Sequence, residues 1–137
     1  MCASIRQQAR SPRGKRVVND VYKTPLVSVI ISNYNYGRYL KSAIQSTLDQ
    51  TYTRTEIIVV DDGSSDDSRQ IIAGFGDRII ACYNDHRGQC AAINTGFSLS
   101  HGDIIILFDS DDLLIDDAIQ RYVDAFAENP ALSKSQG

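Results

Sequence analysis

The sequence contains no apolar run long enough to cross a bilayer. A membrane-spanning helix needs about 20 apolar residues, whereas the longest run here, residues 104–108, has only the length of a strand. Cysteine is scarce as well: Cys2, Cys82 and Cys90 are odd in number and lack the spacing of zinc ligands, so they indicate neither a disulfide framework nor a metal knuckle. We therefore expect a protein of a reducing compartment, the cytoplasm.

Several motifs of phosphate and acyl chemistry are missing too. There is no G-x-x-x-x-G-K-[ST] and no G-x-G-x-x-G after a strand, which excludes a P-loop and a dinucleotide-binding fingerprint. No G-x-S-x-G elbow is present either. The two histidines, His86 and His101, are isolated in the sequence, and we interpret each as a loop residue rather than a ligand or a base.

Charge is present but unevenly distributed. Residues 1–25 carry six Lys/Arg and one acid, a net charge of +5, whereas residues 26–137 carry a net charge of −8. The acidic body argues against nucleic acid as a partner. The basic leader, residues 1–24, has no apolar segment of a secretory signal, and we interpret it as disordered. A transit peptide, or a segment in peripheral association with the inner face of a membrane, stays an open alternative.

From Thr24 onward, segments with strand and helix patterns alternate within a length typical of one domain, residues 25–137. β-branched apolar runs predict strands at 26–31, 56–60, 78–83 and 103–108. Apolar residues at helical spacing predict four helices. The first covers residues 37–50, and the second follows a cap at Ser65 or Asp66. The third covers residues 89–99, with Gly102 as the C-cap, and the fourth covers residues 116–128. This alternation predicts an α/β fold with a Rossmann-like, mostly parallel sheet and flanking helices. Such sheets bind ligands at the carboxyl ends of their strands.

An acidic cluster follows the fourth predicted strand. Asp109, Asp111 and Asp112 lie in a stretch, residues 103–117, that holds six acids and no base. Carboxylates so close together repel one another, and a hard divalent cation such as Mg²⁺ or Mn²⁺ is the usual way to hold them. The alternative is that Asp111 or Asp112 only caps a turn. We favour a metal site because the cluster comes directly after a buried strand.

Two further polar clusters follow the first and second strands. Asp62, in the run Asp61-Asp62-Gly63-Ser64, could accept a hydrogen bond from a base or a ribose, or could belong to a plain turn. Tyr34 could stack on a base or could lie at the edge of the core. Asn94, inside the third helix, could tie loops together beneath a ligand or could point to solvent.

Taken together, these stretches resemble a family 2 glycosyltransferase. The matching stretches include PLVSVII (25–31), YN (34–35), QTY (50–52), EIIVVDDGS (56–64), GQ (88–89) and DSDD (109–112). The resemblance runs from about Thr24 to Pro130 over many spaced positions. It implies a GT-A fold that binds a nucleotide-diphosphate sugar donor and passes the sugar to a saccharide or lipid-linked acceptor, as in cell-wall or polysaccharide biosynthesis.

The resemblance also implies roles for single residues. Ser32, Tyr34 and Asp62 match positions that contact the base, and Asp109 matches a contact to ribose. Asp111 and Asp112 match the metal-binding part of the D-x-D region, with Mg²⁺ or Mn²⁺ as the cofactor.

One helix position departs from the family pattern. Asn94 matches an asparagine that the family places in the third helix, among the donor-binding positions, but the arginine that often precedes it is Ile93 here. An arginine contact to the donor is therefore in doubt.

The family's inverting mechanism needs a carboxylate base downstream of these motifs. The resemblance therefore implies that residues 25–137 are the donor-binding half, truncated before the acceptor half, with no catalytic residue and little transfer activity of their own. Two alternatives are a non-catalytic nucleotide-binding module and a receiver-like phospho-accepting domain, which also gathers acids around Mg²⁺.

Overall fold

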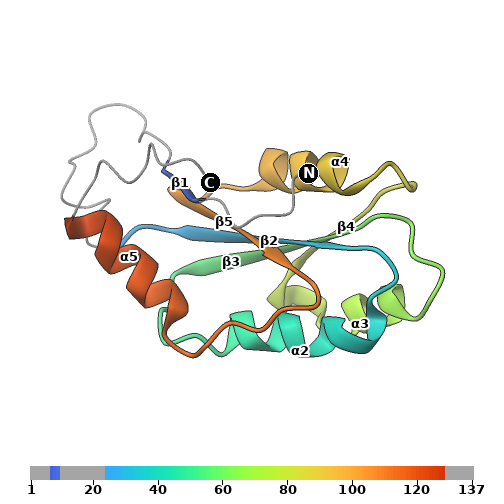
Figure 1. Ribbon diagram of the computed structural model, residues 1–137, viewed down its shortest axis with the longest axis horizontal. Helices are drawn as coiled ribbons and strands as arrows, with labels where there is room; N and C mark the ends of the chain where they lie inside the picture. The colour runs from blue at the N-terminus through green and yellow to red at the C-terminus, as the bar shows by residue number, and fades with distance from the viewer. Residues whose placement is uncertain (1–6, 10–23, 129–137) are drawn as a thin grey trace.

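The computed structural model describes residues 7–9 and 24–128, which form one sheet with helices on both faces (Figure 1). The strands are β1 (Gln7–Ala9), β2 (Val27–Asn33), β3 (Thr55–Asp61), β4 (Ile80–Tyr83) and β5 (Ile104–Asp109). The helices are α2 (Gly37–Leu48), α3 (Ser68–Gly74), α4 (Gln89–Leu99) and α5 (Ala118–Glu128), with a short 3₁₀ helix, η1, at Gly76–Arg78.

The sheet has the strand order β1-β5-β2-β3-β4. β5, β2, β3 and β4 are parallel, so the predicted α/β fold with a mostly parallel sheet is confirmed. β1 pairs antiparallel with β5, from Gln7 opposite Ile106 to Ala9 opposite Ile104. Strand β1 lies in the leader, so the expectation of disorder is wrong for residues 7–9; the rest of residues 1–23 lies outside the described part.

Alternating side chains of the central strands supply two cores, one on each face of the sheet. Val27, Val29 and Ile31 of β2 point to the face covered by α2, α3 and α5, where they pack with buried residues such as Leu40. Ile30 points to the opposite face, which α4 covers (Figure 1). A central strand of a parallel sheet buried on both faces needs a continuous apolar run, which is why β2 reads as one in the sequence.

Helix α4 contacts the sheet through a glycine, Gly96. A Cβ atom on Gly96 would lie 2.4 Å from Cγ2 of Ile30. Since real Cβ contacts are never so short, any side chain at position 96 would push α4 away from β2. The first turn of α4 borders the candidate site, so Gly96 helps to fix the position of that turn.

Glu56 holds the opposite, amino-terminal edge of the sheet together. Its Oε2 accepts hydrogen bonds of 2.5 Å from Ser28 Oγ and from the backbone N–H of His101, and its side chain is only 15% exposed. Burial alone would raise the pKa of Glu56, but these hydrogen bonds and the nearby His101 ring outweigh it and hold the pKa below its usual value. Ser28 Oγ also accepts from Gly102 N at 2.8 Å, so the α4–β5 connection is fixed to β2 and β3.

We expect Glu56→Gln to lower the free energy of unfolding at pH 7 by about 1–2 kcal/mol, because a charged acceptor of two hydrogen bonds is lost. A group whose pKa is lowered by folding stabilises the fold above its unfolded pKa, and this contribution disappears as the pH falls through the folded pKa. The difference between wild type and variant should therefore shrink in acid. Urea unfolding at pH 7 and at pH 3 measures it; a difference that stays constant with pH would contradict the charge argument.

Two local expectations need correction. α4 ends at Leu99, and its C-cap is Ser100, whose backbone N–H bonds to Phe97 O. Gly102 is therefore not the C-cap; it lies against Ser28, where a Cβ would be 2.4 Å from the serine Oγ. Cys90 is disulfide-bonded, although the cysteine pattern indicated no disulfide framework, whereas Cys82 is free. Among the described helices, none is both long and apolar enough to span a membrane.

Candidate functional site

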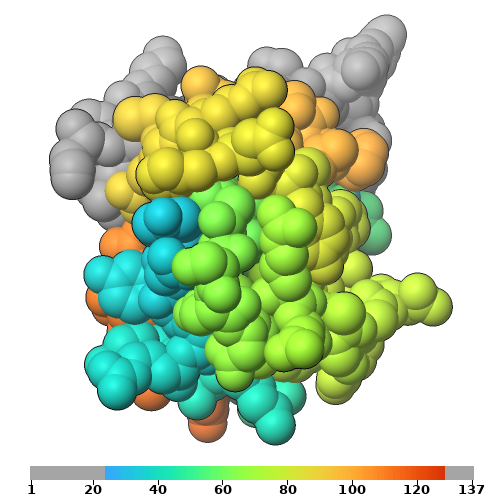
Figure 2. Space-filling model, turned by 90° about the vertical axis from the view of Figure 1, so that its right-hand side faces the viewer, coloured from blue at the N-terminus to red at the C-terminus, as the bar shows by residue number. Residues whose placement is uncertain are grey.

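A cavity of about 330 Å³ opens at the carboxyl edge of the sheet. The chain passes from β2 outward to β3 and β4 and then crosses back to add β5 on the other side of β2, so the strand order reverses between β2 and β5. Ligands of open parallel sheets bind at this switch point. Figure 2 shows the edge end-on, with the segments that follow β2 (blue) and β3 (green) beside the segment that enters α4 (yellow).

The acidic cluster lies at one end of this cavity. One carboxylate oxygen from each of Asp109, Asp111 and Asp112 lies within 4.8 Å of the other two, and Asp109 and Asp111 line the cavity. Burial, followed by the charges of Asp112 and Asp111, raises the pKa of Asp109. Three oxygen ligands that repel one another fit a hard divalent cation, which would reverse the repulsion.

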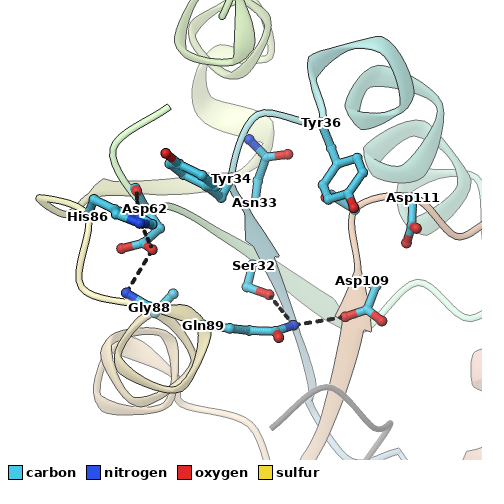
Figure 3. Close-up of a pocket in the computed structure, with 12 residues that line it drawn as sticks. Ser32, Asn33, Tyr34, Tyr36, Asp62, His86, Gly88, Gln89, Asp109 and Asp111 are labelled. Carbon is cyan, nitrogen blue, oxygen red and sulfur yellow. Dashed lines mark hydrogen bonds and ion pairs between the residues drawn. The ribbon is translucent and has the colours of Figure 1, made fainter. Parts of the chain in front are cut away.

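Gln89, the first residue of α4, bridges the middle of the cavity. Its Nε2 lies 3.3 Å from Asp109 Oδ1 and 3.4 Å from Ser32 Oγ (Figure 3). The two contacts connect the ends of β5 and β2 across the switch point. The hydrogen bond to Asp109 also lowers the pKa of this carboxyl, against the larger effects of burial and of the two neighbouring acids.

An aromatic pair lies at the other end of the cavity. The rings of Tyr34 and His86 are stacked with centroids 4.1 Å apart and planes 20° from parallel. Figure 3 shows both rings grouped with Asp62 on one side, while Asp109 and Asp111 lie on the other. The cavity therefore has an aromatic end and an acidic end, as a ligand with a flat ring and a polyphosphate would require.

Asp62 fixes the loop that leads into α4. It is buried, and its Oδ1 accepts from Arg87 N at 2.8 Å while its Oδ2 accepts from Gly88 N at 2.9 Å. His86 Nδ1 lies 3.1 Å from the same Oδ2. The approach is possible because residue 63 is glycine: a Cβ there would be 2.8 Å from His86 N, and its φ is +79°. We call residues 84–88 the clamp loop.

Asp61, the neighbour of Asp62, is also buried but points into the protein. Its Oδ1 accepts from Asn33 Nδ2 at 2.9 Å and from Ser64 Oγ at 2.6 Å. Its Oδ2 accepts from Ser64 N at 2.9 Å and lies 3.4 Å from Arg69 Nε. Asp61 therefore holds the end of β2 to the turn after β3, and its carboxylate has no room left for a ligand.

The loops after β2 and β3 are bonded directly to each other as well. Asn35 adopts a left-handed conformation with a φ of 58°, and its Oδ1 accepts from Ser65 N at 2.8 Å. Its own backbone N–H donates to Ser64 Oγ at 2.9 Å. Asp66 Oδ1 accepts from Ser68 N at 2.9 Å, but the N-cap residue of α3 is Asp67 and not Ser65 or Asp66 as predicted. These contacts hold the aromatic end in place.

The structure brings most of the predicted site residues together. The cavity is lined by five of them, and Asp112 completes the acidic cluster beside it; the five are Ser32, Tyr34, Asp62, Asp109 and Asp111. Asn94 is not among the lining residues: it lies on the exposed side of α4. The roles of these residues toward a ligand remain predictions.

Seven lining residues were not among the predicted site residues, namely Asn33, Tyr36, His86, Gly88, Gln89, Ala92 and Ser110. Gln89 and Gly88 belong to a stretch that carries the family resemblance. The resemblance was therefore the signal that could have identified them as site residues. His86 lies on a loop as expected, but it is not isolated from the site. Its contacts arise from the approach of two distant loops, which no local pattern reveals.

The fold and the site define a class: a Rossmann-like α/β domain with a candidate divalent-cation site at its switch point. Within that class, the family model "Glycosyl transferase family 2" matches residues 28–134, and the chain belongs to this family. A glycosyltransferase of Nostoc sp. (strain PCC 7120) is 43% identical over 104 residues, which are 73% of this chain and 32% of that protein. The glycosyltransferase GlyG of Streptococcus pneumoniae is 36% identical over 110 residues, which are 77% of this chain and 36% of that protein.

Solved structures share the fold at lower identity. Residues 1–349 of S. aureus TarS match with a TM-score of 0.69 and 22% identity, over 77% of this chain and 33% of that one. The mannosyltransferase PcManGT of Pyrobaculum calidifontis, solved with GDP-Man and Mn²⁺, matches with a TM-score of 0.63 and 24% identity, over 75% of this chain and 32% of that one. The predicted GT-A fold is confirmed, and the chain spans about one third of the length of these proteins.

Proposed function

We propose that this chain is the donor-binding part of an inverting glycosyltransferase that takes its sugar from a nucleoside-diphosphate sugar. The observation that carries the proposal is the cavity with an aromatic end and an acidic end at the switch point of the sheet. TarS has been solved with UDP and with UDP-GlcNAc, which supports a nucleotide-sugar ligand for the shared fold.

The acidic end would hold Mg²⁺ or Mn²⁺. Asp109, Asp111 and Asp112 offer oxygen ligands close enough to share one ion, and PcManGT has been solved with Mn²⁺. When bound, such an ion neutralises the charge that develops on a departing diphosphate. Without it, the acidic end of the cavity would repel the two phosphates.

The other residues would bind and orient the donor. Tyr34 and the His86 ring stacked on it would border the base, and Asp62 keeps the clamp loop in place beside them. Gln89 holds Asp109 in a fixed orientation, as well as bridging to Ser32. Positioning of this kind lowers the barrier to transfer because the reacting sugar is held in one geometry.

The proposal for this chain stops at donor binding. Deprotonation of the acceptor hydroxyl needs a general base, which we assign to the part of the relatives' length that this chain does not span. A saccharide or lipid-linked acceptor remains a prediction for the whole enzyme. The receiver-like alternative is less favoured, because Asp61, one of the acids that it would gather around Mg²⁺, is engaged in structural hydrogen bonds.

Isothermal titration with UDP, GDP and dTDP, each with and without Mn²⁺, tests the proposal. We expect at least one of the three to bind in the presence of Mn²⁺ and to bind at least about tenfold more weakly without it, because the metal carries the diphosphate contact. Uridine, which lacks the diphosphate, is the control and should show no metal dependence. Binding that is indifferent to Mn²⁺ would contradict the proposed site.

A further inference from the structure

The tautomer of His86 follows from its contacts. Nδ1 lies 3.2 Å from the backbone oxygen of Asp62 and 3.1 Å from its Oδ2, and both of these atoms can only accept. Nδ1 must therefore carry a hydrogen. In a neutral imidazole the other nitrogen, Nε2, is then a lone-pair acceptor.

This acceptor faces no donor from the protein. Within residues 7–9 and 24–128, no hydrogen bond involves His86 Nε2, and the side chain is 59% exposed. The ring nevertheless lines the cavity and lies flat against Tyr34. A ligand that reaches the aromatic end would therefore pass beside a ring whose remaining nitrogen, Nε2, is free to accept.

A second acceptor without a donor lies beside Tyr34. Asn33 lines the same cavity and is only 2% exposed, and its Oδ1 is buried with no hydrogen-bond partner in the described part of the chain. The orientation of this amide is fixed, because its Nδ2 donates to Asp61 Oδ1 at 2.9 Å and to Ser64 Oγ at 3.3 Å. Because this oxygen has almost no exposed surface, a ligand in the cavity would not reach it without a shift of the surrounding loops.

The position of His86 is also fixed, as discrimination between ligands requires. The backbone N–H groups of Arg87 and Gly88 donate to Asp62 directly after it. Outward movement of the clamp loop would break these bonds, and the close approach of residue 63 to His86 N limits movement inward. A rigid acceptor rejects a ligand whose facing atom is itself a lone pair.

We infer that His86 determines which nucleobase the donor carries, by accepting a hydrogen bond from an imino N–H of the base. The inference rests on the proposed function, since it assumes a nucleoside-diphosphate ligand. Uracil and thymine carry such a hydrogen at N3 and guanine carries one at N1. Cytosine at N3 and adenine at N1 present a lone pair at the equivalent place.

The test is the binding of UDP, GDP, CDP and ADP, each with Mn²⁺, to wild type and to His86→Phe by isothermal titration above pH 7.5. Wild type should bind UDP or GDP about tenfold more tightly than CDP and ADP, the value of one hydrogen bond. His86→Phe keeps a ring on Tyr34 but removes the acceptor, so this preference should fall to about twofold or less. His101→Phe, at the other edge of the sheet, is the matched control and should keep the wild-type preference.

The outcomes separate the two levels of the claim. If no nucleotide binds with Mn²⁺ even to wild type, the proposed function fails and the inference fails with it. If wild type binds and His86→Phe keeps the same order of bases, only the inference is overturned. Because a loop variant could disturb the fold, urea unfolding of both variants accompanies the titration, and His86→Gln, which keeps an acceptor and a donor, should restore part of the preference.

Discussion

Replacing Asp111 by Asn is expected to weaken Mn²⁺-dependent binding of UDP or GDP by about 100-fold. The carboxylate lies with those of Asp109 and Asp112 within 4.8 Å, and its loss leaves two charged ligands where a hard cation prefers several. Because Asp111 is exposed, the free energy of unfolding should hardly change. Isothermal titration with and without Mn²⁺ measures the loss.

Asp116→Asn is the matched control for this prediction. It removes the same charge from the same loop, and Asp116 is exposed and lies outside the acidic cluster. We expect its effect on binding to stay within about twofold, because exposed charges are strongly screened. Equal losses in the two variants would mean that general charge, and not a metal site, determines binding.

Asp62→Ala is expected to release the clamp loop and to lower the free energy of unfolding by about 2–4 kcal/mol. The backbone N–H groups of Arg87 and Gly88 would lose a buried, charged acceptor, and each unpaired group carries a cost. His86 would lose its partner as well, so the aromatic end should open and nucleotide binding should weaken by at least tenfold.

Hydrogen exchange makes this second prediction specific. The amides of Arg87 and Gly88 should exchange much faster in Asp62→Ala, while those of β2 and β5 should change only as far as global stability does. Asp85→Ala is the matched control, because Asp85 is an exposed acid on the clamp loop. Unchanged exchange at Arg87 and Gly88 in Asp62→Ala would show that Asp62 does not hold the loop.

Most of the fold could be predicted from the sequence because its signals are local and periodic. The β2 run, residues 27–33, is rich in β-branched residues and buried on both faces, and α4 occupies the residues expected for it, 89–99. Once the strands are parallel, topology alone brings Asp62 and Asp109 to one edge. The convergence of the acidic and aromatic clusters follows from chain order, without any knowledge of side-chain contacts.

The rest of the site depends on contacts between loops, which leave no periodic signal. The bridge of Gln89 between Ser32 and Asp109 exists because Gly96 lets α4 approach β2. The stacking of His86 on Tyr34 exists because residue 63 has no side chain. Asn94 could not be placed from the sequence. The helical period predicts where a residue lies around α4, but packing decides which side of the helix faces the cavity.

The most direct test of the donor site is a map of the backbone amides that respond to UDP and to metal. With UDP and Mg²⁺, signals of Tyr34, His86 and Gly88 should shift, and replacing Mg²⁺ by Mn²⁺ should broaden those of residues 109–112. A second hollow of about 460 Å³ lies at the opposite edge of the sheet, beside Thr51 and Arg54. Responses confined to that hollow, or Mn²⁺ broadening away from residues 109–112, would contradict a donor site at the switch point.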